Sequence, residues 1–272
     1  MKKVITLLTD FGLKDSYIGA MKGVILSINP EVHIIDITHD IEPQSILDAA
    51  FVLYTTYSYF PKGTIHLAVV DPGVGTERRP IGITTQDYYF IGPDNGVFGL
   101  VLGKHRDSEV FQLINNTYFR EKISQTFHGR DIFAPVAAHL SLGVTLDKIG
   151  RVIKDYKGIE IPEPFLTQGL LEGQIIYRDR FGNLVTNVSQ EIFSHFVGHD
   201  SFEIEVGPFK TQTLRSAYAE VAPGEPLAIF GSTGYLEISE NMGNASARLG
   251  LDVGDPIRIR KIMINVKNPK PK

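Results

Sequence analysis

Over the first half of the chain, short apolar runs alternate with longer runs whose apolar residues recur at helical spacing. The apolar runs predict strands at residues 4–8, 32–37, 65–70 and 110–113, and a hairpin at 81–85 and 88–91. Helices are expected between them, at residues 16–28, 43–57, 95–103 and 131–141. Strands that alternate with helices of about 10–15 residues form right-handed βαβ units. The sequence therefore predicts an α/β domain with a mostly parallel sheet.

The pattern changes after residue 153. Residues 154–168 contain two prolines and little periodicity, as is typical of a linker. Beyond them, short β-rich runs are separated by glycine or proline, except for one or two helical turns at residues 244–249. This pattern predicts a small antiparallel barrel or sandwich. We therefore expect an α/β domain at residues 1–153, a linker at 154–168 and a smaller β-rich domain at 169–272.

The composition excludes several classes of protein. The chain has 272 residues and no cysteine, which excludes disulfides, thiol catalysis and iron–sulfur clusters and fits a cytoplasmic protein. Its net charge of −4 gives no basic surface, so we expect no nucleic-acid partner. The first apolar run, Val4–Leu8, is too short for a signal peptide or a membrane span. We therefore expect no membrane partner either.

Aspartates stand at or just after the predicted ends of four strands, at Asp10, Asp36, Asp71 and Asp94. Ligands of open α/β sheets bind outside the carboxyl ends of the strands. Each aspartate alone is more often a cap, but together they predict an acidic rim suited to a polyhydroxylated or cationic ligand. Arg78 follows Asp71 after one glycine-rich loop, close enough to fold back over it. The alternative is a capping aspartate and a solvated arginine.

Other catalytic or binding motifs are weak. Gly73-Val-Gly75 begins a dinucleotide fingerprint, but Arg78 stands where its third glycine belongs. The chain has no phosphate-binding loop and no Gly-x-Ser-x-Gly elbow. A metal site could be imagined at His33, Asp36, His39 and Asp40. Alternation along a strand sends the first two of these to opposite faces, so we expect no metal.

A stretch in the second half, Asp179-Arg-Phe-Gly-Asn183, follows a predicted strand and combines an acid, an aromatic and a carboxamide. Asn183 could read the amino edge of a purine while Phe181 stacks on its ring. Taken alone, the same residues also suit a hairpin turn.

Seven motifs in order run through essentially the whole chain: Leu8-Thr-Asp-Phe-Gly12, Asp36-Ile-Thr-His39, Asp71-Pro-Gly-Val-Gly-Thr76, Gly92-Pro-Asp-Asn-Gly96, Thr126-Phe-His-Gly-Arg-Asp-Ile-Phe-Ala-Pro135, Asp179-Arg-Phe-Gly-Asn183 and Gly231-Ser-Thr-Gly-Tyr-Leu-Glu237. In these motifs the chain resembles the S-adenosyl-L-methionine (SAM) hydroxide adenosyltransferase family, relatives of the 5′-fluorinases and 5′-chlorinases. The resemblance implies an α/β N-terminal domain and a β-rich C-terminal domain. It also implies a homotrimer, with substrate held where the N-terminal domain of one subunit meets the C-terminal domain of a neighbour.

The reaction implied by the resemblance is attack of water or hydroxide on C5′ of SAM, giving adenosine and L-methionine. SAM is then the substrate, and neither a cofactor nor a metal is expected. The family's Asp/Arg/His triad maps onto Asp71, Arg78 and His128. Arginine stays protonated, so either His128 or Asp71 must accept the proton of water. The sequence leaves that choice open.

The resemblance also implies the substrate-binding residues. Asp10 would bind the ribose hydroxyls, and Asp179 the methionine ammonium. The remaining contacts would be Phe181 and Tyr218 with the adenine ring, Asn183 with its edge, Asn241 and Met242 with the adenine pocket through their main chain, and Ser16 and Ser232 with the methionine carboxylate. Halogenating relatives have an arginine where this chain has Thr233, and Glu237 could reshape that end of the site.

Two alternatives to SAM hydrolysis stay open at the level of sequence. One is a SAM-dependent halogenase. The fluorinase has a tyrosine at the position of Asp71 and a serine at that of Gly129, and this chain has neither, which disfavours a halide nucleophile. The other is a non-catalytic adenosine- or SAM-binding protein, in which the ligand would bind without turnover.

Overall fold

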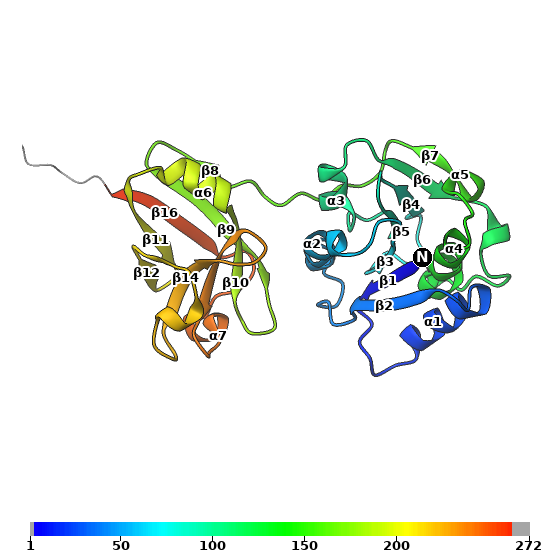
Figure 1. Cartoon of the computed structure of the whole chain (residues 1–272), viewed down its shortest axis with the longest axis horizontal. Helices are drawn as coiled ribbons and strands as arrows, with labels where there is room; N and C mark the ends of the chain where they lie inside the picture. Colours follow the sequence, from blue (N-terminus) through cyan, green and yellow to red (C-terminus); the bar gives the residue numbers. More distant parts are fainter. Residues whose placement is uncertain (1–2, 263–272) are drawn as a thin grey trace, which may run out of the picture. The chain divides into compact units, whose positions relative to one another are not determined.

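The computed structural model describes residues 3–262. The chain divides into two compact units, residues 1–160 and 161–272, and each has its own sheet (Figure 1). Within the described range, none of the helices combines the length and the apolar character needed to cross a membrane.

The first unit contains a seven-stranded sheet with the strand order β2-β1-β3-β5-β4-β6-β7. Its strands are β1 (Val4–Thr9), β2 (His33–Thr38), β3 (Ile65–Val69), β4 (Pro80–Thr84), β5 (Tyr89–Pro93), β6 (Glu109–Leu113) and β7 (Gly150–Ile153). Its helices are α1 (Tyr17–Ile28), α2 (Ile46–Thr56), α3 (Gly99–Lys104), α4 (Ala134–Ser141) and α5 (Leu146–Ile149), with shorter helical turns η1 (Tyr57–Tyr59), η2 (Asn116–Tyr118) and η3 (Gly129–Phe133).

Strand direction divides this sheet into two halves. Strand β1 is parallel to β2 and β3, and β3 is parallel to β5. Strand β4 is antiparallel to β5 and β6, and β6 is antiparallel to β7. The predicted α/β class is confirmed, but the sheet is mixed, with only one half parallel. Parallel neighbours need a crossover, and the short turn between β4 and β5 leaves no room for one.

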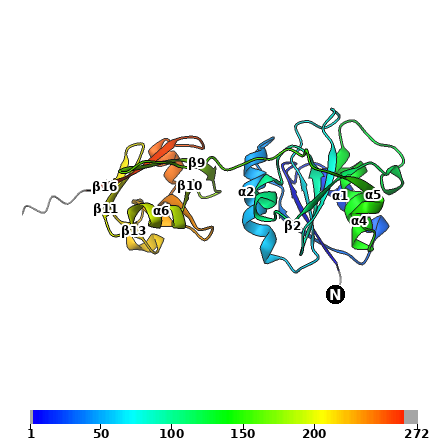
Figure 2. The same ribbon diagram turned by 90° about the horizontal axis from the view of Figure 1, so that it is seen from above.

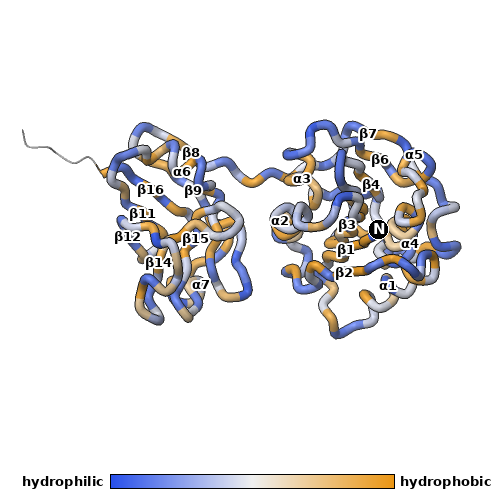
Figure 3. Tube along the Cα trace, in the orientation of Figure 1, coloured by the Kyte–Doolittle hydropathy of each residue, from blue (hydrophilic) through white to orange (hydrophobic). Residues whose placement is uncertain are grey.

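The two faces of the sheet bury separate apolar cores. Leu67 of β3 packs in one core with Met21 of α1, and its neighbour Ala68 packs in the other with Leu53 of α2. Successive residues of a strand point to opposite faces, so a central strand covered on both sides is apolar throughout. Figure 2 shows α2 and α4 on opposite sides of the sheet, and Figure 3 shows the apolar strands between them.

The second unit is β-rich, with strands ordered β12-β11-β16-β9-β10-β15-β14-β13 and β8 added on β9. Its strands are β8 (Phe165–Leu166), β9 (Leu170–Arg178), β10 (Leu184–Ser189), β11 (Ser201–Val206), β12 (Phe209–Thr211), β13 (Leu214–Arg215), β14 (Pro226–Phe230), β15 (Tyr235–Glu240) and β16 (Pro256–Ile262), and its helices are α6 (Gln190–Val197), η4 (Tyr218–Glu220) and α7 (Ala245–Leu249). This sheet curls into a nearly closed barrel around Leu171, Ile204 and Ile238, which confirms the predicted barrel-like fold.

Candidate functional site

Asp71 and Arg78 form a buried ion pair beyond the carboxyl end of β3, which finishes at Val69. Nε of Arg78 lies 2.9 Å from Oδ1 and 3.0 Å from Oδ2 of Asp71, and Nη2 also donates to Oδ2. Each of the two side chains is only 5% exposed. The arginine therefore folds back over the aspartate, and it is not the solvated arginine of the alternative interpretation.

His128 joins this pair through Arg78. Nη2 of Arg78 lies 2.9 Å from Nδ1 of His128. Because a guanidinium is always protonated, it must be the donor, so Nδ1 is the acceptor and a neutral imidazole carries its proton on Nε2. Burial, followed by the positive charge of Arg78, lowers the pKa of His128 from 6.5, although the charges of Asp71 and Asp131 act in the opposite direction.

The ring of Phe133 packs against the guanidinium of Arg78. Cζ of Arg78 lies 5.2 Å from the centre of the Phe133 ring, which is fully buried. Packing against an aromatic ring restricts the orientation of a guanidinium group. Nη1 of Arg78 is buried and has no hydrogen-bond partner within residues 3–262. Phe133 was not among the predicted site residues, and its only sequence signal was membership of the motif that contains His128.

Three close contacts position the segment that carries His128. This residue immediately precedes the π-helical turn η3, in which the fully buried Asp131 accepts from Nε of Arg130 at 2.7 Å and from the amide of Ser124 at 2.8 Å. Gly75 has a φ of +76°, and a Cβ there would lie 2.3 Å from the carbonyl oxygen of Gln125. Only glycine therefore allows the loop between Asp71 and Arg78 to approach the His128 segment this closely.

Asp10 and Ser16 lie on segments that contact the residue before His128. The Phe11 and Phe127 ring centres are 5.9 Å apart, and those of Tyr17 and Phe127 are 5.2 Å apart. Oδ2 of Asp10 accepts from the amide of Gln44 at 2.9 Å. Ser16 is exposed at the start of α1, and its side chain makes no capping hydrogen bond. The structure thus brings these two residues to the same edge of the sheet as the triad.

The other two aspartates of the predicted acidic rim are paired with cations of the protein. Asp36 accepts from Nζ of Lys22 at 2.6 Å and lies 3.1 Å from Nε2 of His39. Asp94 is 2% exposed and accepts from Arg79. Within residues 3–262 no group of three or more His, Asp or Glu side chains is placed to hold a metal ion.

In the second unit, Asp179 and Asn183 form a hydrogen-bonded turn between β9 and β10. Oδ1 of Asp179 accepts from the amides of Phe181 and Asn183, and Oδ2 accepts from Nδ2 of Asn183 at 2.8 Å. The turn leaves the Phe181 side chain 73% exposed. Both interpretations of this stretch are therefore compatible, because the hairpin turn itself presents the aromatic ring.

A second group of predicted residues surrounds Glu237 on β15. Its Oε1 accepts from the Tyr218 hydroxyl at 2.9 Å and from the Ser239 hydroxyl at 2.6 Å. Burial, then this hydrogen bond, and then the charges of Glu237 and Asp179 raise the pKa of Tyr218 to about 12. Tyr218 is therefore a neutral donor whose ring, 42% exposed, is fixed through its hydroxyl.

The remaining predicted residues lie in turns. Ser232 is exposed in the turn between β14 and β15. Nδ2 of Asn241 donates to the carbonyl of Val221 at 2.7 Å, next to η4. Met242 has a φ of +56° and is 88% exposed. A residue other than glycine with this backbone conformation is uncommon and is often found at functional sites.

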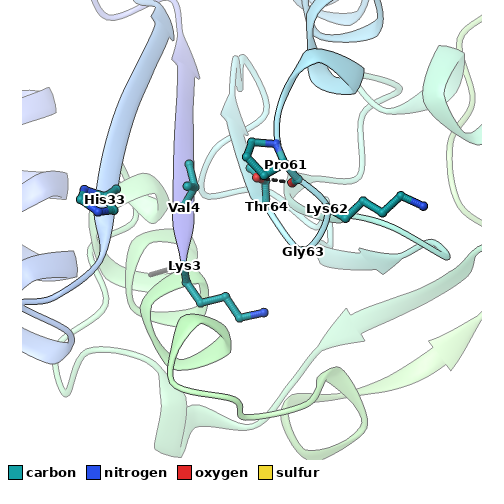
Figure 4. A pocket seen from close by; sticks show the side chains of 7 residues that line it. All are labelled: Lys3, Val4, His33, Pro61, Lys62, Gly63 and Thr64. Carbon is teal, nitrogen blue, oxygen red and sulfur yellow. Dashed lines mark hydrogen bonds between the residues drawn. The ribbon is translucent and has the colours of Figure 1, made fainter. Parts of the chain in front are cut away.

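A pocket of about 440 Å³ lies at the opposite edge of the first sheet, where β1, β2 and β3 begin (Figure 4). It is lined by Lys3, Val4, His33, Pro61, Lys62, Gly63 and Thr64. None of these is a predicted site residue. Nζ of Lys62 is 3.0 Å from Oδ1 of Asp87, so one of the lysines that line the pocket is already paired with a carboxylate.

Comparison with known protein families finds two matches. The model of the SAM hydroxide adenosyltransferase N-terminal domain matches residues 5–150, and that of the C-terminal domain matches residues 173–258. Together these matches cover most of both units.

Similar proteins have curated functions. An (R)-S-adenosyl-L-methionine hydrolase of Thermus thermophilus is 36% identical over 263 residues, covering 94% of this chain and 98% of the relative. The enzyme of the same name from Methanocaldococcus jannaschii is 37% identical over 268 residues, covering 94% and 95%. A fluorinase of Actinopolyspora mzabensis is 25% identical over 293 residues, covering 96% and 98%.

Two solved structures share the fold. A crystal structure of an uncharacterized conserved protein from Thermotoga maritima has a TM-score of 0.88 and 40% identity, covering 94% of this chain and 100% of that chain. A conserved hypothetical protein from Thermus thermophilus has a TM-score of 0.76 and 34% identity, covering 94% and 99%.

Proposed function

The chain belongs to the SAM hydroxide adenosyltransferase family, and on this premise we propose that it is an enzyme that hydrolyses SAM to adenosine and L-methionine. The observation that carries the proposal is the buried Asp71–Arg78 pair with Arg78 donating to His128. This unit lies at the edge of the sheet where α/β proteins bind their ligands. SAM hydrolases that are 36% and 37% identical match nearly the whole chain, which supports the same reaction here.

The reaction suits a site without a metal or cofactor, and we propose that none is required. The oxygen of water forms a bond to C5′, the C5′–S bond breaks with its electron pair going to sulfur, and one proton is released. The leaving group is a neutral thioether, so no Lewis acid or general acid is needed to expel it. Charge disperses in the transition state, and a dry site that aligns oxygen, carbon and sulfur supplies much of the rate.

The hydrogen-bond direction in the triad separates the roles of its members. His128 uses the Nδ1 lone pair to accept from Arg78, so its neutral ring offers Nε2–H as a donor. We infer that this donor orients the water oxygen. The carboxylate of Asp71 is then the remaining group of the triad with basic lone pairs, and we assign it as the proton acceptor. Arg78 holds the other two groups together.

Water is favoured over halide as the nucleophile in this proposal. A Cβ on Gly129 would lie 3.2 Å from Sδ of Met21 and 3.3 Å from Cε2 of Phe127. These contacts are tight, so a larger residue beside His128 would require its neighbours to move. The site also places at Asp71 a carboxylate that can accept a proton from water, whereas a halide nucleophile needs no base.

The substrate-binding roles are also part of the proposal. Asp10 binds the ribose, Asp179 the methionine ammonium, and the exposed rings of Phe181 and Tyr218 the adenine. The other contacts proposed are Asn183, Asn241 and Met242 with adenine, and Ser16, Ser232 and Glu237 at the methionine end. A cytoplasmic location stays a prediction from the composition.

The reaction is tested by incubating the protein with SAM in H₂¹⁸O that contains chloride, followed by mass spectrometry of the nucleoside. We expect adenosine with ¹⁸O on C5′ and an equal amount of L-methionine. A 5′-chloro nucleoside would assign the chain to the halogenases. Bound but intact SAM would identify a binding protein and overturn the proposed hydrolysis.

We also propose the homotrimer implied by the resemblance, in which the triad of one subunit and the adenine residues of another serve one substrate. Co-expression of two defective chains tests this arrangement. His128→Ala removes one member of the triad. Phe181→Ala removes an exposed aromatic ring that is proposed to bind adenine. Mixed trimers should hydrolyse SAM faster than the two variants measured separately and averaged. A rate equal to that average would place each site within one subunit, and light scattering gives the mass relative to the 30.2 kDa chain.

A further inference from the structure

The turn after β5, Asp94 and Asn95, forms hydrogen bonds with the residues at both ends of the Asp71–Arg78 loop. Nδ2 of Asn95 donates to the carbonyl of Val70 at 2.8 Å, directly before Asp71. Asp94 receives two hydrogen bonds from Arg79, directly after Arg78, from Nε at 2.9 Å and from Nη2 at 2.6 Å. The amide of Asp94 also donates to the carbonyl of Arg79 at 2.9 Å. Two consecutive residues thus fix the neighbours of both members of the pair.

This turn is itself braced by the segment that follows β7. Oδ1 of Asp94 accepts from the amide of Lys157 at 2.7 Å, and Nη1 of Arg79 donates to Oδ1 of Asp155 at 2.9 Å. Nη2 of Arg79 also reaches the carbonyl of Asp155 at 2.6 Å. A Cβ on Gly99 would lie 2.3 Å from the amide nitrogen of Ile159, so the segment presses directly on the start of α3. The buried Asp94 carboxylate therefore accepts three hydrogen bonds from protein donors, two at Oδ2 and one at Oδ1.

The loop between Asp71 and Arg78 has few internal hydrogen bonds besides the ion pair. The Thr76 hydroxyl donates to the carbonyl of Gly73 at 2.7 Å and accepts from the amide of Arg78 at 3.4 Å. The backbone hydrogen bonds inside it are two turn contacts of 3.2 Å, from Val74 to Asp71 and from Thr76 to Gly73. Glycines within it add conformational freedom. A bidentate ion pair requires both side chains to start from fixed positions, and a displacement of about 1 Å at a catalytic group can cost about 10²-fold in rate. Contacts from outside the loop are therefore needed in addition to its own turns to fix these positions.

We propose that Asp94 and Asn95 are positioning residues for the Asp71–Arg78 pair, holding the loop ends so that Arg78 reaches Asp71 and His128 together. The proposal rests on the proposed hydrolase function and assigns a role to residues that contact neither substrate nor water. The sequence predicts Asp94 on an acidic rim that binds ligand, whereas in the structure it holds Arg79, the residue next to Arg78.

The test compares Asp94→Asn with Asp87→Asn. The first variant keeps the size of the side chain but removes the charge that holds Arg79. The second removes a carboxylate from the opposite end of the β4–β5 hairpin, where it pairs with Lys62. We expect Asp94→Asn to lower kcat about 10- to 100-fold while KM for SAM changes less than about threefold, and Asp87→Asn to leave both unchanged.

A readout independent of activity separates this proposal from the proposed function. His128 faces Arg78, Asp71 and Asp131, and the nearby cation contributes to its lowered pKa. If Arg78 shifts away in Asp94→Asn, NMR titration should show the His128 pKa moving upward, even if the wild-type protein hydrolyses nothing. If Asp94→Asn does not fold, Arg79→Lys, which keeps the charge but loses the two-pronged contact, carries the same test. A folded variant with unchanged kcat and unchanged His128 titration would overturn the proposal.

Discussion

Replacing Arg78 with lysine should lower kcat for SAM hydrolysis by about 10²- to 10³-fold, with KM changing only a few fold. Arginine donates through Nε and Nη2 to Asp71 while Nη2 also reaches His128. A lysine ammonium is a single point donor and cannot hold both partners in this geometry. Steady-state kinetics with adenosine measured by chromatography gives both constants.

Lysine is the informative substitution because it keeps the positive charge. Asp71 is 5% exposed, and removing its cation would leave a buried charge uncompensated, at a cost of about 3–5 kcal/mol in stability. A loss of activity in Arg78→Ala could therefore reflect unfolding. Arg151→Lys is the matched control, since the Arg151 side chain on β7 donates to Oε1 of Gln112, outside the triad, and lysine keeps its charge near Asp155. If Arg78→Lys keeps wild-type kcat, the triad is not the catalytic unit.

The arrangement of the ion pair follows closely from local sequence. The apolar run of β3 ends at Val69, and the Asp-Pro-Gly that follows marks the loop beyond a strand end. Arg78 is seven residues from Asp71, near enough that a tight loop brings them together. His128 lies 50 residues from Arg78, and no periodicity of the chain relates the two positions. It could be assigned only from resemblance to a family.

The roles of Asp36 and Asp94 could not be predicted from the sequence, because their hydrogen-bond partners come from other parts of the fold. Asp36 is paired with Lys22 of α1 across one crossover. Asp94 accepts a hydrogen bond from the amide of Lys157, 63 residues further along the chain. In sequence these residues look like Asp71, and only the three-dimensional packing separates a structural aspartate from one at the triad. The same applies to Phe133, whose role depends on its contact with Arg78.

Helix α6 is a helix that the local sequence signals indicate within the β-rich unit. Ser189 caps it by accepting from the amide of Ile192, and Gly198 ends it with a φ of +59°. Phe193 and Phe196 are buried at helical spacing between these two signals. The sequence analysis predicts helical turns in this unit only at residues 244–249, so α6 is a difference between the prediction and the structure. In the first unit, the predicted hairpin at residues 81–91 already implies one antiparallel pair, and β6 and β7 extend the antiparallel half of the sheet beyond it.

Lowering the pH should inactivate the enzyme only below pH 6.5, through protonation of His128. Its pKa lies below 6.5 because of burial and, after that, the charge of Arg78. The neutral ring accepts from Arg78 at Nδ1, whereas the protonated ring has no lone pair there and would be repelled by the guanidinium. Activity is therefore present above the pKa and is lost as the pH falls through it, by about tenfold per pH unit for one proton.

Substitution of His128 separates this titration from others. His128→Ala should lower kcat about 10²- to 10⁴-fold, and its residual rate should lose the acid limb assigned to His128. His139→Gln is the matched control, because His139 on α4 also has a pKa lowered by burial and packs on Tyr118, outside the triad. That variant should keep both the rate and the limb. An acid limb centred above pH 6.5, or one that persists unchanged in His128→Ala, would contradict the neutral, Arg78-bound histidine and with it the assignment of Asp71 as the proton acceptor.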